Sequence, residues 1–91
     1  MQPEEMIAAS ANAVAREVGG ETVLLDLDSG TYFGLNAVGG FIWSLIEKEP
    51  RSLAALADAV AADFDVTHDE ALRDVTALAQ AFAEHELLKG S

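Results

Sequence analysis

The sequence predicts a small α+β domain with the layout of a winged helix-turn-helix: a three-stranded antiparallel sheet followed by three helices. Residues 13–35 alternate apolar and polar side chains between glycine turns, which is typical of paired strands. Residues 37–85 carry apolar side chains at helical spacing, interrupted by capping residues and one proline. The chain of 91 residues is long enough for one domain with one small core.

The first residues are expected to differ from the rest of the chain. Residues 1–12 show no hydrophobic period and combine Pro3 with two glutamates. We expect a flexible tail there, because nothing in this stretch specifies packing. A short helix, or a segment that orders on binding, is the alternative. Residues 13–91 would then form the folded domain.

Three strands, separated by glycine turns, are expected at residues 13–18, 21–28 and 31–35. Residues 19–20 are both glycine, and Gly30 ends the second turn, where it can adopt the positive φ of a bulged loop. In the second strand Val23, Leu25 and Leu27 share one face. We expect that face to point toward the core.

Each helix begins after a residue whose side chain can accept the unpaired N–H groups of a first turn: Asn36, Ser52 and Thr67. The helices are expected to end near Lys48, Phe64 and His85, with the leucines at 87 and 88 folding back to close the core. Residues 39–40 are glycines inside the first helix, at a cost of about 1 kcal/mol each relative to alanine. Close approach of another backbone would explain them.

The charge of the chain excludes several classes of partner. Sixteen acidic and five basic residues give a net charge of −11, which repels nucleic-acid phosphates and anionic lipids. No apolar run approaches the ~20 residues that span a bilayer, and the acidic N-terminus is unlike a signal peptide. There is no cysteine for a disulfide or a thiolate metal site. We therefore expect a cytoplasmic protein.

No catalytic, cofactor or metal constellation is visible. His68 and His85 each stand alone, without a second ligand at metal-binding spacing. The acidic turn ending at Gly30 resembles the start of a calcium loop, but Thr31 and Ala37 occupy the positions that require glycine and glutamate. We expect no enzyme activity and no cofactor.

Beside the core stripe of the third helix runs a second line of residues, Asp74, Ala77 and Ala81. Two alanines beside a carboxylate would leave a shallow trough. Surface alanines in a helix of high propensity are an equally plain explanation. The strand at 31–35 has an aromatic content and a free edge, and such an edge invites pairing with another chain.

Residues 23–46 resemble the PqqD-like proteins, also called RiPP recognition elements. The resemblance rests on an apolar strand, a glycine turn, an aromatic strand ending in Leu-Asn, and a helix with a small residue before Ile-Trp. In this chain these are Leu24-Leu25-Asp26, Gly30, Tyr32-Phe33, Leu35-Asn36, Gly39 and Ile42-Trp43. The stretch 69–88, with Asp74-Val75 and Leu78, is similar to the family's third helix. The chain departs from the family pattern at His85-Glu86, where glycine often precedes the final leucines.

The resemblance implies a winged-helix domain that binds the leader segment of a ribosomally made precursor peptide. The leader would add as a strand to the third strand and lie against the third helix. The length and the Leu35-Asn36 stretch are most similar to stand-alone modules from lasso-peptide clusters, which deliver the precursor to a separate leader peptidase before a cyclase acts. The expected peptide-binding residues are Thr31, Tyr32, Phe33, Gly34, Leu35, Asp74, Ala77, Leu78 and Ala81.

An acidic winged-helix module for regulation or DNA binding is the alternative function. The fold permits it, but the charge opposes it, and Arg73 is the one cation on the second or third helix. The sequence leaves open the leader sequence, the final product, the surface that contacts the peptidase, and whether the exposed strand pairs two copies of the chain.

Overall fold

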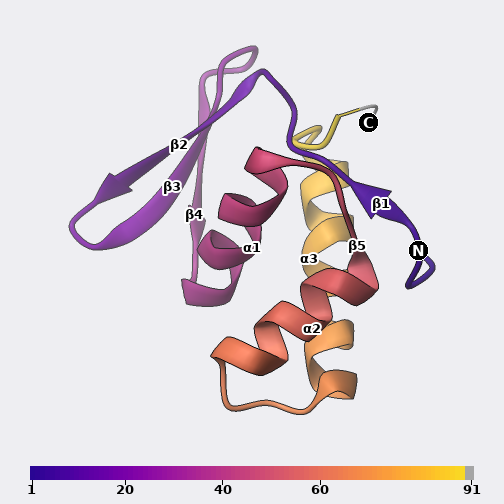
Figure 1. Cartoon of the computed structure of the whole chain (residues 1–91). Helices are drawn as coiled ribbons and strands as arrows, with labels where there is room; N and C mark the ends of the chain where they lie inside the picture. The colour runs from indigo at the N-terminus through magenta and orange to yellow at the C-terminus, as the bar shows by residue number, and fades with distance from the viewer. Residues whose placement is uncertain (90–91) are drawn as a thin grey trace.

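A three-stranded antiparallel sheet stands to one side of three helices, as the sequence predicts (Figure 1). The structure is a computed structural model that describes residues 1–89. The helices are α1 (Ala37–Lys48), α2 (Leu53–Asp63) and α3 (His68–Glu84). The strands are β1 (Met6–Ile7), β2 (Ala13–Val18), β3 (Glu21–Asp26), β4 (Thr31–Leu35) and β5 (Arg51–Ser52).

The sheet has the order β2-β3-β4, so β3 is central and β4 is an edge strand. Leu24 of β3 lies opposite Phe33 of β4, and Leu25 lies opposite Tyr32. Gly30 takes a φ of +72° and donates its N–H to the carbonyl of Asp26 at 2.7 Å, which closes the turn between these strands.

The face of β3 that packs on the helices is the reverse of the expected one. Leu24 is fully buried at 0% exposure, whereas Val23 and Leu25 are half-buried and Leu27 is 55% exposed. The cross-strand neighbours explain this outcome, because Ala15 and Phe33 lie beside Leu24 and also pack against the core. The expectation that Val23, Leu25 and Leu27 face the core was therefore wrong.

All three helix caps form as predicted. The Asn36 side chain accepts the N–H of Gly39 at 2.8 Å, and Ser52 and Thr67 accept from the third residue beyond them. Each cap satisfies a donor that the first turn leaves unpaired. The caps fix where each helix starts, and Asn36 in particular places the first turn of α1 directly after β4.

The core lies between α1, α2, α3 and the inner face of the sheet. Trp43 is 1% exposed and meets Phe82 edge-on at 5.4 Å between ring centroids. Its indole N–H donates to Glu47 at 3.1 Å, so the one polar atom of the ring has a partner. This contact joins α1 to α3 through the centre of the molecule.

Gly40 marks a close approach, although not the backbone approach that was expected. A Cβ at Gly40 would lie 2.8 Å from the hydroxyl oxygen of Thr22 on β3. A Cβ at Gly39 would lie 3.3 Å from atoms of Asn36 and Leu35. The glycines therefore let α1 lie against side chains of the sheet and of its own cap.

The first twelve residues pack against the domain, whereas a flexible tail was expected. β1 pairs with β5, Ile7 is 5% exposed, and Ala9 forms a bridge with Leu88. Backbone N–H groups of residues 9 and 10 donate to carbonyls of Ile46 and Leu87. The strand pair has only two residues on each side, which is too short to show a hydrophobic period.

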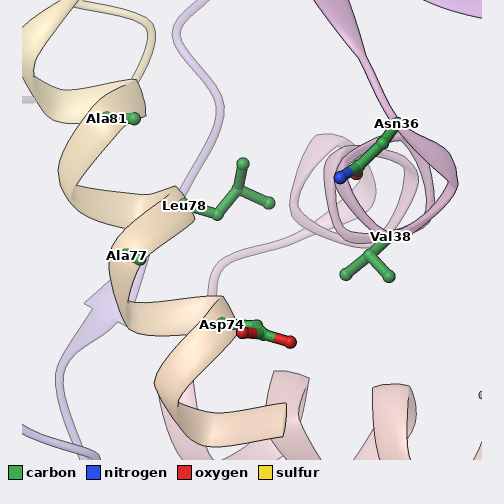
Figure 2. A pocket seen from close by; sticks show the side chains of 6 residues that line it. All are labelled: Asn36, Val38, Asp74, Ala77, Leu78 and Ala81. Carbon is green, nitrogen blue, oxygen red and sulfur yellow. The ribbon is translucent and has the colours of Figure 1, made fainter. Parts of the chain in front are cut away.

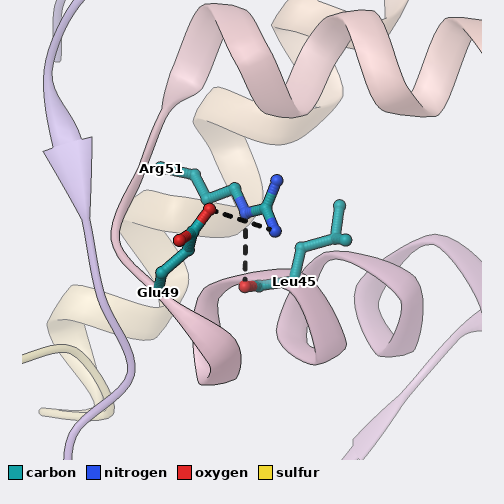
Figure 3. A network of polar contacts seen from close by, with 3 residues as sticks. All are labelled: Leu45, Glu49 and Arg51. Carbon is teal, nitrogen blue, oxygen red and sulfur yellow. Dashed lines mark hydrogen bonds and ion pairs between the residues drawn. The ribbon is translucent and has the colours of Figure 1, made fainter.

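Arg51 of β5 also caps α1 from outside the helix (Figure 3). Its Nε donates to the carbonyl of Leu45 at 3.4 Å, and its guanidinium lies 3.6 Å from the carboxylate of Glu49. The Leu45 carbonyl also accepts the N–H of Glu49 at 3.4 Å, so Arg51 adds a second donor and a positive charge at the C-terminal end of the helix, where a cation is favoured. It therefore holds β5 against the end of α1.

The C-terminal leucines fold back as predicted. The Leu87 N–H donates to the Phe82 carbonyl at 2.9 Å, and the Glu86 N–H donates to the Ala83 carbonyl at 3.1 Å. This pair of bonds is a Schellman motif. Glu86 takes its left-handed position with a φ of 58°, where glycine is usual. Leu87 and Leu88 are buried as a result.

Candidate functional site

The free edge of β4 presents the backbone groups of two residues. The N–H of Leu27 donates to the Asn12 carbonyl on the β2 side at 2.8 Å. Because bonding direction alternates along a strand, odd residues of β3 bond to β2 and even residues bond to β4. Their β4 partners, Phe33 and Leu35, therefore point their polar groups toward β3. Tyr32 and Gly34 point theirs outward, where no described strand pairs with them.

A hollow of about 420 Å³ lies between α3 and the start of α1, directly after the end of β4 (Figure 2). Six residues line it: Asn36, Val38, Asp74, Ala77, Leu78 and Ala81. Asp74 and Leu78 point from α3 toward the first turn of α1. The two alanines contribute only methyl groups, so the α3 wall stays low along much of its length. The first hollow, as we call it, is mostly apolar with one carboxylate at its end.

The two polar side chains of the first hollow differ in availability. The Asn36 carbonyl oxygen is engaged by the N–H of Gly39. The Asp74 carboxylate is exposed and makes no hydrogen bond or ion pair with a residue that the structure describes. Asp74 is thus the charge that the first hollow can offer to a cation or to an amide donor.

A second contact joins β4 to the other end of α3. The ring of Phe33 lies 4.6 Å from that of His85, tilted by 47°. Since Asn36, which follows β4, meets the stretch of α3 from Asp74 to Ala81, the strand and the helix run in opposite directions. The surface between β4 and α3, which we call the trough, therefore has His85 at one end and Asp74 at the other. The spacing of the sequence did not reveal this role for His85.

The structure brings only part of the expected site together. Asp74, Ala77, Leu78 and Ala81 line the first hollow, with Asn36 and Val38 added from the start of α1. Thr31 stands at the turn, where its N–H and hydroxyl bond to Ser29. Tyr32 is 66% exposed and lies on the opposite face of the sheet from Phe33, so it does not share a wall with Leu78.

The outer face of the sheet carries a second apolar surface. Val14, Leu25 and Tyr32 lie side by side across the three strands, and Val23 lies next to them. None of these side chains packs against the main core. An uncovered apolar face of this kind is typical of a protein contact. Arg16, opposite Val23, is the one cation on this face.

Over residues 1–89, no three His, Asp or Glu residues gather as metal ligands. His68 pairs with Asp58 at 2.8 Å on the exposed surface between α2 and α3. No described helix is long and apolar enough to cross a membrane.

The comparison with known families decides the identity of the fold. A profile of the family described as "Coenzyme PQQ synthesis protein D (PqqD)" matches residues 21–88. This chain belongs to the PqqD family. The match includes β3, β4 and all three helices, and so includes both sides of the first hollow. As a PqqD-like protein, the chain has the α+β fold and the RiPP recognition element that its sequence resembles.

Two solved structures are similar over nearly the whole chain. One is described as "TbiB1 in Complex with the TbiA(beta) Leader Peptide"; it is 39% identical, covers 92% of this chain and 96% of its own, and has a TM-score of 0.81. The other, "Lasso peptide synthetase B1 complexed with the leader peptide", is 24% identical, covers 91% and 96%, and has a TM-score of 0.79. The comparison with curated proteins returned no match.

Proposed function

We propose that this PqqD-like chain binds the leader segment of a ribosomally made precursor peptide, of the lasso class, by strand addition to β4. The observation that carries this proposal is the juxtaposition of an open, uncharged strand edge with the apolar first hollow on α3. An extended peptide uses both features at once, because its backbone pairs with the edge while alternate side chains enter the hollow. The relative at 39% identity is described in complex with a leader peptide, which supports the same ligand class.

The backbone of the leader would bond to the outward groups of Tyr32 and Gly34. Ordering each leader residue costs about 1–2 kcal/mol, and each buried apolar side chain contributes about 1.5–3 kcal/mol. Two or three apolar anchors are therefore needed before the backbone bonds yield useful affinity. Leu78, Val38 and the methyl of Ala81 would contact such anchors, and Asp74 would accept from a basic or amide side chain.

The edge of β4 fits this function better than the edge of β2. β2 carries Arg16 and Glu17, and charged residues on an edge strand oppose pairing with another chain. β4 carries no charged residue over its five positions. The first hollow also opens beside the end of β4, so side-chain contacts and backbone contacts coincide there.

We further propose that the chain is an adaptor, without catalysis of its own, that presents the leader to a separate leader peptidase and on to a cyclase. The outer face of the sheet, formed by Val14, Val23, Leu25 and Tyr32, would contact the peptidase. A strand added to β4 would extend this face by its own outward side chains, so the peptidase would meet leader and adaptor together. Because a ribosomally made precursor is first available in the cytoplasm, we propose that this step takes place there.

The test compares two substitutions at Gly34. Gly34→Pro removes the outward N–H and adds a ring at the edge, but it leaves the bonds to β3 intact. Binding of a fluorescent TbiA(beta) leader peptide should weaken about tenfold or more, since each lost backbone bond is worth about 0.5–1.5 kcal/mol and the ring also blocks the strand. Gly34→Ala is the matched control, because a Cβ there meets no atom within 4 Å.

Equal affinity of Gly34→Pro and wild type, with both folded by circular dichroism, would contradict strand addition. Absence of binding of this peptide to the wild type would contradict leader recognition itself.

A further inference from the structure

A second hollow lies on the adjoining face of α3 and meets the first one at a single side chain. Its volume is about 550 Å³. Six residues line it: Asp69, Leu72, Arg73, Thr76, Ala77 and Gln80. Ala77 lines both hollows. Because its side chain is one methyl group, the ridge between the two hollows is low at this point.

The direction of the bound strand brings one of its ends to this ridge. β4 and α3 run in opposite directions, with Phe33 at His85 and the end of β4 at Asp74. A strand that is antiparallel to β4, like every pairing in this sheet, therefore runs in the direction of α3. Its N-terminal end arrives beside Asp74. Residues that precede the strand must leave the trough there, next to the second hollow.

Arg73 gives the second hollow a charge that its surroundings lack. It is exposed, and among the residues that the structure describes it forms no ion pair within 4 Å. The chain has only five basic residues in a net charge of −11. Asp69 also lines the second hollow, so its lining carries one charge of each sign, and Arg73 is the group in it that attracts a carboxylate. Leu72, partly buried against the core, adds an apolar floor.

We propose that the N-terminal flank of the bound leader crosses α3 over Ala77 and lies in the second hollow, where an acidic side chain of the flank pairs with Arg73. This inference rests on the proposed strand addition. It adds a contact outside the strand that selects leaders by the charge of their flank. Asp74 and Arg73 then read opposite charges on the two sides of the same ridge.

A charge-swap experiment tests the pairing. Single Glu and single Lys substitutions are scanned through the residues of the TbiA(beta) leader peptide that precede the bound strand. At each position, the affinity of the Glu peptide is divided by the affinity of the Lys peptide. At one or two adjacent positions this ratio should be larger for the wild type than for Arg73→Glu, and the factor between the two ratios is the coupling. The coupling should be about two- to fivefold at low salt, as for exposed ion pairs, and should shrink at high salt.

The matched control is Lys48→Glu. It makes the same change in net charge at an exposed position of α1, and it lines neither hollow. For Lys48→Glu, the coupling should be the same at every position of the leader that is scanned. A nitroxide on the flank should also broaden the amide signals of Thr76 and Gln80. Coupling no larger than in the control, or no broadening at Thr76 and Gln80, overturns the inference. Strand addition still stands in that case if Gly34→Pro weakens binding and Gly34→Ala does not.

Discussion

The side chain of Ala77 is one methyl group, whereas most exposed helix positions carry a longer side chain. This short side chain leaves room beside Leu78. The neighbouring residues of the first hollow act differently. Leu78 offers apolar surface, and Asp74 offers a negative charge that no residue of 1–89 pairs with. The proposed site thus depends on a small side chain as much as on the groups that would make contacts.

A bulky substitution at Ala77 should fill the first hollow. Ala77→Trp is expected to weaken binding of the TbiA(beta) leader peptide by about 1.5–3 kcal/mol, because one apolar anchor loses its place. Fluorescence anisotropy measures the affinity. Ala62→Trp, at an exposed alanine of α2 that lines neither hollow, should leave it unchanged. Equal affinities for the two variants would remove the first hollow from the account.

Glu86 is a non-glycine residue whose backbone takes a left-handed conformation, which its side chain disfavours. A non-glycine residue in the left-handed region costs about 1–2 kcal/mol relative to the right-handed one. Here φ is 58°, because the Schellman motif requires that conformation to turn Leu87 into the core. The departure from the family pattern at this position therefore leaves the closure itself intact.

Glu86→Gly should stabilise the chain. Removing the strained side chain and keeping both bonds of the motif should raise the free energy of unfolding by about 0.5–1 kcal/mol, since the greater entropy of unfolded glycine offsets part of the gain. Urea denaturation followed by circular dichroism measures it. His85→Gly, one residue earlier at a φ of −94°, should not stabilise the chain. A stability loss in Glu86→Gly would show that its side chain has a role that its exposed position does not reveal.

At the scale of the elements, local signals predicted the strands and helices well. Glycine turns and capping side chains act within a few residues, so the bounds of β2, β4 and α1 match the expected ranges. The face of β3 was missed because both of its faces carry leucine. Alternation shows which residues share a face, but only the neighbours on β2 and β4 decide which face is buried.

The site was predictable in the same uneven way. Asp74, Ala77 and Ala81 follow from helical spacing alone. Val38 and His85 do not, because their roles depend on how α1 and α3 meet β4. Asn36 was identified as a cap, and it is also a wall of the first hollow. The short β1–β5 pair was missed because two-residue strands leave no periodic trace.

Substitutions on the outer face of the sheet should weaken binding of the peptidase and leave binding of the leader unchanged. Leu25 lies between Val14 and Tyr32 on this face, outside the main core. Leu25→Glu should reduce co-purification with the pathway's peptidase about tenfold, because a buried charge in an apolar contact is costly. Leader affinity should stay within about twofold of wild type. Ala62→Glu is the control for the added negative charge. Undiminished peptidase binding in a folded Leu25→Glu protein would move the contact elsewhere.

On the scale of the whole molecule, the free strand edge and α3 come from parts of the chain that are distant in sequence. α1 and its cap connect them. The first residues form backbone hydrogen bonds with the end of α1 and with the final leucines, and they pair with β5. The net charge of −11 opposes contact with the phosphate backbone of DNA. An acidic body with two uncovered apolar surfaces fits an adaptor between a peptide and a protein.

Amide hydrogen exchange, resolved by residue with NMR, tests the central claim most directly. In the free chain, Tyr32 and Gly34 should exchange quickly, while Phe33 and Leu35 are already protected by their bonds to β3. Saturating TbiA(beta) leader peptide should slow Tyr32 and Gly34 by about tenfold or more and so remove the alternation. If the peptide binds and these two amides exchange as they do in the free chain, the leader does not add as a strand to β4.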